Sequence, residues 1–375
     1  MPAPSREKMV HEKRLEAKLA DMPPYVVEYI RAKKRSKYSA STLLGYVHDF
    51  YKFFQWLRQE GISNVELIRE TSLETLEKLS KENVEYYKEH LEEEVIQERN
   101  GVPKKRSNDA VLRNINALKS LFNYLTQETE NQDGECYFYR NVFSKIKLSK
   151  EKITANRRAK KISSIILSDQ EIDDFLYFLE VEYEKNLSKH QLSLFLRDKE
   201  RDIAIISVLL GSGVRVSEIA NLLIHDINFK KEQIDIIRKG NKEDTVLVLP
   251  SALKALKSYL QVREERYKSA NSVPYVFVTR YKGNAHPISV RAIQNLVAKY
   301  TVAFNSQGDS TGQALSPHKF RHTFASEWIR TGGNLVLLRD QLGHSSMEAT
   351  SKYTNLSAAE SKKVIDRMDK SRNKN

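Results

Sequence analysis

Side chains that could handle a phosphate group lie in the last third of the chain. His318 and Arg321 stand three residues apart in SPHKFRHT, after Ser316 and Pro317, which suit the cap and the first position of a helix. Side chains three residues apart share one helix face, and the N-terminal end of a helix attracts anions. An imidazole and a forked guanidinium could therefore reach one phosphate together, and ordinary exposed polar residues of a helix are the alternative interpretation.

A second histidine and a tyrosine follow in the sequence. Gly343 is predicted to end a helix in the left-handed conformation, and His344 comes directly after it. Ser345 and Glu348 form a capping-box pattern for a short helix, and Tyr353 falls near the end of that helix. Polar residues surround Tyr353 in ATSKYTN, so we expect an exposed hydroxyl that could face a ligand. An ordinary surface tyrosine is the alternative interpretation.

An arginine and a lysine occupy two predicted turns farther upstream. The segment GSGVRVSE ends an apolar helix with two glycines and presents Arg215, which Glu218 could hold by a charge-assisted hydrogen bond. A simple surface ion pair is the alternative. Lys239 lies in RKGNKE, between the alternating segments QIDIIR and DTVLVL, and this pattern predicts a β-hairpin.

The composition favours a polyanionic partner. The 375 residues include 62 Lys and Arg against 49 Asp and Glu, a formal net charge of +13, which favours nucleic acid. The N-terminus lacks the apolar core of a signal peptide, and the longest apolar stretches are far shorter than the roughly 20 residues that cross a bilayer. The single cysteine, Cys136, excludes an internal disulfide. We expect a cytoplasmic, nucleoid-associated protein with no membrane partner.

Helical periodicity predicts two domains. Apolar residues recur at three- and four-residue steps behind Ser39 and again from Val111 to Leu125, with almost no strand pattern, which predicts an all-helical first domain. After a basic, aperiodic linker, a capping box at Ser168 opens a second domain with one β region and a C-terminal tail helix. The predicted parts are an N-terminal extension, a helical domain, the linker and the second domain (residues 1–22, 23–143, 144–163 and 164–375).

Runs of basic residues in the first domain and the linker are predicted to contact DNA phosphates, although a merely solvated face explains each single run equally well. These residues are Lys33, Lys34, Arg35, Lys104, Lys105, Arg106, Arg157, Arg158, Lys160 and Lys161.

Together these residues resemble the active-site signature of the tyrosine recombinases, the phage integrase-like family. The matching positions, in the family's order, are Arg215, Glu218, Lys239, His318, Arg321, His344 and Tyr353. The resemblance implies a mainly α fold with a small antiparallel β-sheet, made of a helical core-binding domain and a catalytic domain. Within the family the chain is most similar to the Xer group. The FYRN segment at 138–141 and the insertion near 187–199 suggest the single-recombinase XerS type.

The resemblance also implies a mechanism. Tyr353 attacks a phosphodiester and forms a 3′-phosphotyrosyl bond, and a DNA 5′-hydroxyl later reverses the step, with no metal, ATP or other cofactor. Arg215, Arg321 and His344 bind the non-bridging oxygens, Lys239 protonates the leaving 5′-oxygen, and His318 shares the proton of the tyrosine.

The implied partners are duplex DNA with a specific recombination site, three further protomers in a tetramer on two sites, and a DNA translocase as a further candidate. The implied role is resolution of chromosome dimers at a dif-like site. Integration of a mobile element, a relaxing topoisomerase, a non-catalytic DNA-binding protein and a metal-dependent nuclease that uses His318 and His322 are the alternatives. Against the nuclease, the sequence has no cluster of carboxylates near His318 and His322 that could complete a metal site.

Overall fold

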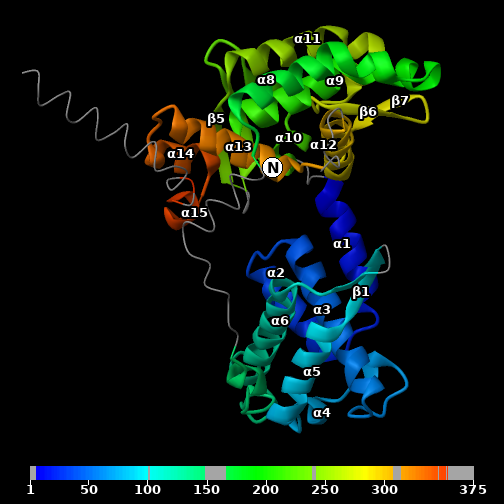
Figure 1. Ribbon diagram of the computed structural model, residues 1–375. Helices are drawn as coiled ribbons and strands as arrows, with labels where there is room; N and C mark the ends of the chain where they lie inside the picture. Colours follow the sequence, from blue (N-terminus) through cyan, green and yellow to red (C-terminus); the bar gives the residue numbers. More distant parts are fainter. Residues whose placement is uncertain are drawn as a thin grey trace, which may run out of the picture. The chain divides into compact units, whose positions relative to one another are not determined.

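The computed structural model describes residues 6–99, 102–147, 166–238, 242–306, 314–344, 346–351 and 353 (Figure 1). The chain divides into two compact units, residues 1–152 and 153–375. Most of the predicted linker, including Arg157, Arg158, Lys160 and Lys161, lies outside the described residues. No helix in the described part is long and apolar enough to span a membrane.

The first unit is built mainly from helices that surround an aromatic-rich core. The long helix α3 begins after Ser39, whose hydroxyl accepts a hydrogen bond from the amide of Thr42. The predicted apolar face of α6 is confirmed, since Ile115, Leu118 and Phe122 are fully buried. The helices are α1 (Arg6–Leu19), α2 (Pro24–Arg35), α3 (Ala40–Gln59), α4 (Leu73–Glu77), α5 (Lys81–Glu93) and α6 (Asn108–Gln127), with 3-10 turns η1 (Ile68–Glu70) and η2 (Val142–Lys145).

Two features of the first unit differ from the sequence interpretation. The predicted N-terminal extension contains α1, which packs on α3 and places Leu15 in the core. The expectation of an all-helical first domain is wrong, because strands β1 (Val95–Arg99) and β2 (Val102–Lys105) form an antiparallel hairpin. Val95 and Ile96 are exposed on this hairpin, so backbone pairing rather than an alternating apolar face supports it.

The second unit carries the predicted β region among helices. Strands β3, β4 and β5 form one antiparallel sheet, which confirms the predicted hairpin. The elements are α8 (Asp169–Tyr177), a π-helical turn η3 (Phe178–Glu182), η4 (Tyr183–Asn186), α9 (Lys189–Ser212), α10 (Val216–Ala220), η5 (Ile224–Asp226), β3 (Ile227–Asn228), β4 (Gln233–Arg238), β5 (Lys242–Leu247), α11 (Pro250–Arg266), η6 (Ala270–Ser272), β6 (Val278–Tyr281), β7 (Asn284–Pro287), α12 (Val290–Asn305), α13 (Pro317–Arg330), α14 (Leu335–Leu342) and α15 (Glu348–Ser351).

A second hairpin, β6–β7, was not predicted, and the expectation of a single β region is therefore wrong. Its two-residue loop is Lys282-Gly283, with φ of 48° and 86°. Two successive residues with positive φ form the turn that matches the twist of a tight hairpin. A lysine in the first position is an unusual choice there, which explains why the sequence pattern was missed.

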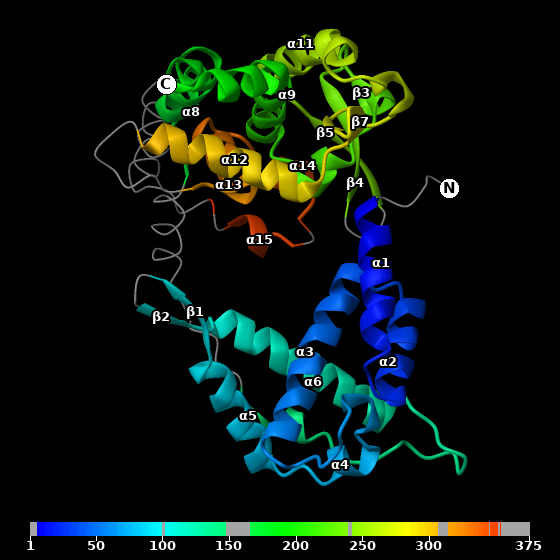
Figure 2. The same ribbon diagram turned by 90° about the vertical axis from the view of Figure 1, so that its right-hand side faces the viewer.

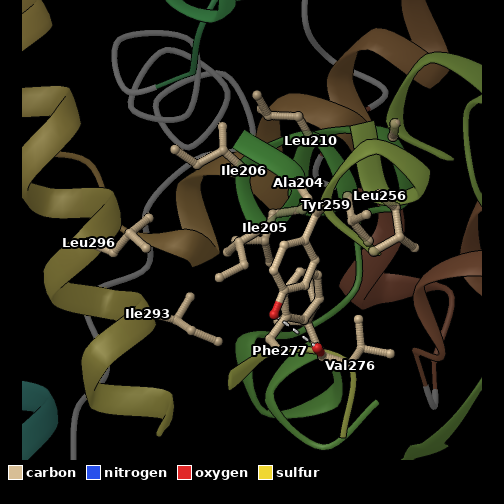
Figure 3. Packing of buried hydrophobic residues seen from close by; sticks show 14 of the residues in the cluster. Ala204, Ile205, Ile206, Leu210, Leu256, Tyr259, Val276, Phe277, Ile293 and Leu296 are labelled. Carbon is tan, nitrogen blue, oxygen red and sulfur yellow. Dashed lines mark hydrogen bonds between the residues drawn. The ribbon is translucent and has the colours of Figure 1, made fainter. Parts of the chain in front are cut away.

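Helix α9 is the central support of the second unit, and both α11 and α13 pack against it (Figure 2). Its buried side chains Ala204, Ile205 and Ile206 lie in the hydrophobic cluster drawn in Figure 3. In the same cluster the hydroxyl of Tyr259 donates a hydrogen bond to the carbonyl of Val276, 3.2 Å away. The packing of α13 on α9 brings the C-terminal end of α9 close to the start of α13, where the Gly213 carbonyl accepts a hydrogen bond from Arg321.

A buried polar contact in the first unit provides a stability test. Asn114 on α6 accepts a hydrogen bond from Tyr87 at 3.0 Å and donates one to the Asp49 carboxylate at 3.2 Å. Asn114→Ala leaves both buried partners short of a hydrogen bond and should cost about 2 kcal/mol of unfolding free energy. Asn116→Ala, at an exposed position of the same helix, should change it by less than about 0.5 kcal/mol.

The chain has two tryptophans, Trp56 in the first unit and Trp328 in the second. Urea unfolding followed by the fluorescence of Trp56 in a Trp328→Phe background measures the first unit separately. Equal unfolding free energies for the two asparagine variants would contradict the assignment of the Asn114 contacts as stabilising.

Candidate active site

Side chains of several arginines meet at the C-terminal end of α14. Arg238 donates to the carbonyls of Gln341 and Leu342, at 2.7 and 3.1 Å. Arg321 also donates to the carbonyl of Leu342, and Arg215 Nη2 lies 3.4 Å from that of Gly343. The last carbonyls of a helix have no partner within the helix and carry partial negative charge. These carbonyls therefore collect guanidinium groups at one place, which creates a positively charged region.

Arg215 is held by a buried carboxylate, as the sequence predicted. It occupies the cap position of α10, where its backbone amide donates to Glu218 Oε2 at 2.7 Å and its Nη1 donates to Oε1 at 2.8 Å. The Glu218 side chain is 2% exposed, whereas that of Arg215 is 35% exposed. One face of the Arg215 guanidinium group therefore remains accessible to a ligand.

Arg321 is a buried cation on α13. Its Nη1 donates to the carbonyl of Gly213 at 2.7 Å, so both of its terminal nitrogens bind backbone oxygens. Burial and the charge of Arg215 lower the pKa of Arg321 to about 10. An anion bound beside Arg321 would offset this cost, which makes the position suitable for a phosphate.

Glycine is required where α9 reaches α13. Gly213 has a φ of 66°, and a Cβ added there would lie 2.5 Å from the ring of Phe324. The absence of a side chain lets the end of α9 approach α13 closely enough for the Gly213 carbonyl to accept the hydrogen bond from Arg321.

Tyr353 is buried, which corrects the expectation of an exposed hydroxyl. The residue is 1% exposed and belongs to an apolar cluster with Phe324, Leu338 and Leu342. The polar neighbours in the sequence misled the prediction, because packing against α13 and α14 decides where the ring lies. Burial raises the pKa of Tyr353 above its ordinary value, so the hydroxyl stays protonated at neutral pH.

A histidine contacts the hydroxyl of this tyrosine. His322 Nδ1 lies 2.6 Å from the Tyr353 oxygen, and His322 is adjacent to Arg321 on α13. His318, one turn earlier on the same helix, has its ring centroid 4.4 Å from that of His322. A histidine within hydrogen-bonding distance of the phenol therefore lies beside the arginines.

His344 follows the predicted helix end. Gly343 has the predicted left-handed conformation, with a φ of 61°, and the Nδ1 atom of His344 lies 2.9 Å from the hydroxyl of Thr350 on α15. Lys239 lies outside the described residues, between β4 and β5. In the described part of the chain, no three His, Cys, Asp or Glu side chains gather in a metal-binding arrangement.

Comparisons with known proteins identify the family. The model of the phage integrase family matches residues 178–360. Tyrosine recombinase XerS of Streptococcus sanguinis is 38% identical over 355 residues, which cover 95% of this chain and 98% of the relative. The XerS protein of Streptococcus agalactiae serotype III is 39% identical over 347 residues, 92% of this chain and 96% of the relative.

The chain belongs to the tyrosine recombinase family. It is a site-specific recombinase, an enzyme that breaks and rejoins DNA strands. Among solved structures, the XerH site-specific recombinase bound to difH substrate aligns with a TM-score of 0.56 at 20% identity. That alignment covers 87% of this chain and 78% of XerH, and supports the mainly helical fold with small antiparallel sheets.

The structure adds two residues of this recombinase that the sequence analysis did not assign to the site. Arg238 is buried at the end of β4, where the alternation of Ile234, Ile236 and Arg238 points inward. A charged residue in an inward position of an alternating strand could have revealed it. His322 was considered only as a metal ligand, and the sequence holds no pattern that would pair it with Tyr353.

The predicted DNA-contact residues of the first unit lie in different settings. Lys34 and Arg35 are exposed at the end of α2, and Lys104 and Lys105 are exposed on β2 rather than on a helix. Two others take part in ion pairs within the unit, namely Lys33 with Glu128 at 3.0 Å and Arg106 with Glu94 at 2.6 Å.

The contact between His322 and Tyr353 leads to a prediction for the pH dependence of cleavage. A protonated phenol with a raised pKa needs a proton acceptor to react at neutral pH, and the His322 ring lies within hydrogen-bonding distance of it. His322→Gln should therefore lower the single-turnover cleavage rate about a hundredfold at pH 7. Its rate should keep rising to pH 9, whereas that of the unchanged enzyme should level off.

His225→Gln is the control, because the His225 side chain is 75% exposed, and it should keep both the rate and the levelling pH profile. If the pH profile changes in His318→Gln and not in His322→Gln, then His318 rather than His322 accepts the proton of Tyr353.

Proposed function

We propose that the recombinase cleaves duplex DNA through Tyr353, with Arg215, Lys239, His318, Arg321 and His344 acting on the scissile phosphate. Glu218 supports Arg215. The observation that carries this proposal is the gathering of Arg215, Arg321 and the Tyr353–His322 pair around the end of α14. These side chains come from three distant segments, yet all are of the types that phosphoryl transfer requires.

The proposed reaction is a transesterification. The Tyr353 oxygen attacks phosphorus, its proton passes to a histidine, and the bond from phosphorus to the 5′-oxygen breaks. Lys239 donates a proton to that oxygen, which leaves as a 5′-hydroxyl while the 3′-phosphate stays on the tyrosine. Arg215, Arg321 and His344 stabilise the negative charge on the non-bridging oxygens. A 5′-hydroxyl of another strand reverses the step, so the bond energy is conserved and no cofactor is needed.

The proposed biological role is resolution of chromosome dimers at a dif-like site. The support for this role is the similarity to XerS recombinases over 95% of the chain, which includes the first unit as well as the catalytic unit. Such a role places the protein on the nucleoid in the cytoplasm, with a DNA translocase as a candidate partner. Exposed basic residues such as Lys34 and Lys104 would add phosphate contacts.

Replacing the nucleophile tests the central step. Tyr353→Phe removes the attacking oxygen, so it should abolish the covalent adduct on a nicked suicide duplex that carries a candidate site. Specific binding in a gel shift should stay within about threefold, since the residue is buried and contributes no basic charge.

Tyr281→Phe is the matched control, because Tyr281 is 60% exposed on β6 and should form the adduct at the normal rate. Persistent adduct formation by Tyr353→Phe would remove Tyr353 from the proposed role.

We expect a tetramer on two sites, joined by the tail. The amphipathic segment that begins at about Ala359 lies outside the described residues, and its predicted role is to dock on a neighbouring protomer. Deleting it should leave the gel shift of a half-site near normal. Cooperative binding to a full site and strand exchange should be lost, because cooperativity is a coupling energy between protomers.

Both affinities should be measured at one salt concentration, because the electrostatic contribution to DNA binding changes with salt. Undiminished cooperativity and recombination after the deletion would show that the tail packs on its own domain.

A further inference from the structure

Arg238 has more polar partners than a structural ion pair requires. Its Nε donates to the Asp244 carboxylate at 2.8 Å, and its Nη1 lies 3.4 Å from both oxygens of Glu218. The same guanidinium group donates to the carbonyls of Gln341 and Leu342 at the end of α14. The Arg238 side chain is 7% exposed and its contacts with Glu218, Gln341 and Leu342 are buried, whereas the Asp244 side chain is 39% exposed.

The shared carboxylate connects Arg238 to the phosphate-binding arginine. Glu218 receives Arg215 on one side, at 2.8 Å, and Arg238 on the other. If Glu218 were paired with Arg215 alone, its negative charge would cancel the positive charge of that arginine. With Arg238 as a second partner, the group carries one more positive than negative charge. Its members are Arg215, Arg238, Arg321, Glu218 and Asp244.

The side chain of Arg238 also packs against the turn before His344. A Cβ added at Gly343 would lie 2.5 Å from Arg238 Nε, so the guanidinium group packs directly on the glycine. Gln341 strengthens this junction, since its side chain donates to the carbonyls of Ser212 and Leu247 at 3.0 and 2.8 Å. Arg238 therefore lies where the β4–β5 hairpin, α10 and the end of α14 meet.

We infer that Arg238 is a positioning residue for cleavage, which acts through Glu218 to keep Arg215 correctly placed for the scissile phosphate. This inference rests on the proposed function, because it requires Arg215 to bind that phosphate. Arg238 itself is buried behind the site and contacts no substrate in this account.

A double-mutant cycle tests the inference. Arg238→Met should lower the single-turnover cleavage rate at saturating DNA between about tenfold and a hundredfold, while the Kd for DNA changes by less than about threefold. In a Glu218→Gln background the same substitution should lower the rate by less than about threefold, because the route through Glu218 is already lost. Arg238→Lys keeps the charge and should restore part of the rate.

Arg263 offers a matched control for the structural effect of removing a buried arginine. It is 2% exposed in the same unit and donates to the carbonyls of Ala270, Val273, Tyr275 and Val276. Arg263→Met should lower the melting temperature, yet its effect on the cleavage rate of folded enzyme should be small. Any loss of cleavage rate in Arg263→Met should multiply with the loss caused by Glu218→Gln, because the two residues act independently.

Two results would overturn the inference. One is that the losses of cleavage rate caused by Arg238→Met and by Glu218→Gln multiply in the double variant. The other is a rate loss in Arg238→Met no larger than that in Arg263→Met. A failure of the proposed function is recognised separately, because the unchanged enzyme would then form no adduct through Tyr353.

Discussion

The end of α14 is the point on which the catalytic arrangement depends. Its last carbonyls cannot be satisfied within the helix, and the guanidinium groups of Arg238, Arg321 and Arg215 approach them from three other segments. Each contact joins a helix end to a cation, so the same interactions tie the segments together and concentrate positive charge. A phosphate bound there would meet charges that the fold has already brought together, which lowers the reorganisation needed for catalysis.

The packing of the second unit holds the three arginines in place at the end of α14. Helix α9 packs along α11 and α13, and its end carries Gly213, whose carbonyl fixes Arg321. On the opposite side, Gly343 lets the guanidinium group of Arg238 pack against the backbone before His344. The burial of Tyr353 follows from the same packing, because its ring fills the apolar space between α13 and α14. Tyr353 and the arginines are thus held by one set of contacts.

The sequence predicts the local features of this arrangement well. The pairing of Arg215 with Glu218 depends on three-residue spacing at a helix start, and the left-handed Gly343 depends on backbone sterics. Both are short-range effects, so the sequence pattern contains them. The β4–β5 hairpin and the amphipathic faces of α3 and α6 are predictable for the same reason.

The features that sequence analysis missed depend on contacts between distant segments. Tyr353 has polar neighbours in the sequence, yet it is buried by Phe324 of α13 and Leu338 of α14. Arg238 has carbonyl partners more than 100 residues away. The hairpins β1–β2 and β6–β7 lack a strong alternating pattern in the sequence, so their backbone pairing is evident only in the structure.

The most direct test of the account is the identity of the residue that carries the DNA. The enzyme would be trapped on a nicked suicide duplex, the DNA digested to a short remnant, and the modified peptide sequenced by mass spectrometry. The account predicts a 3′-phosphonucleotide on Tyr353, in the peptide that follows His344. A nucleotide on any other of the 18 tyrosines, or on a serine, would contradict it.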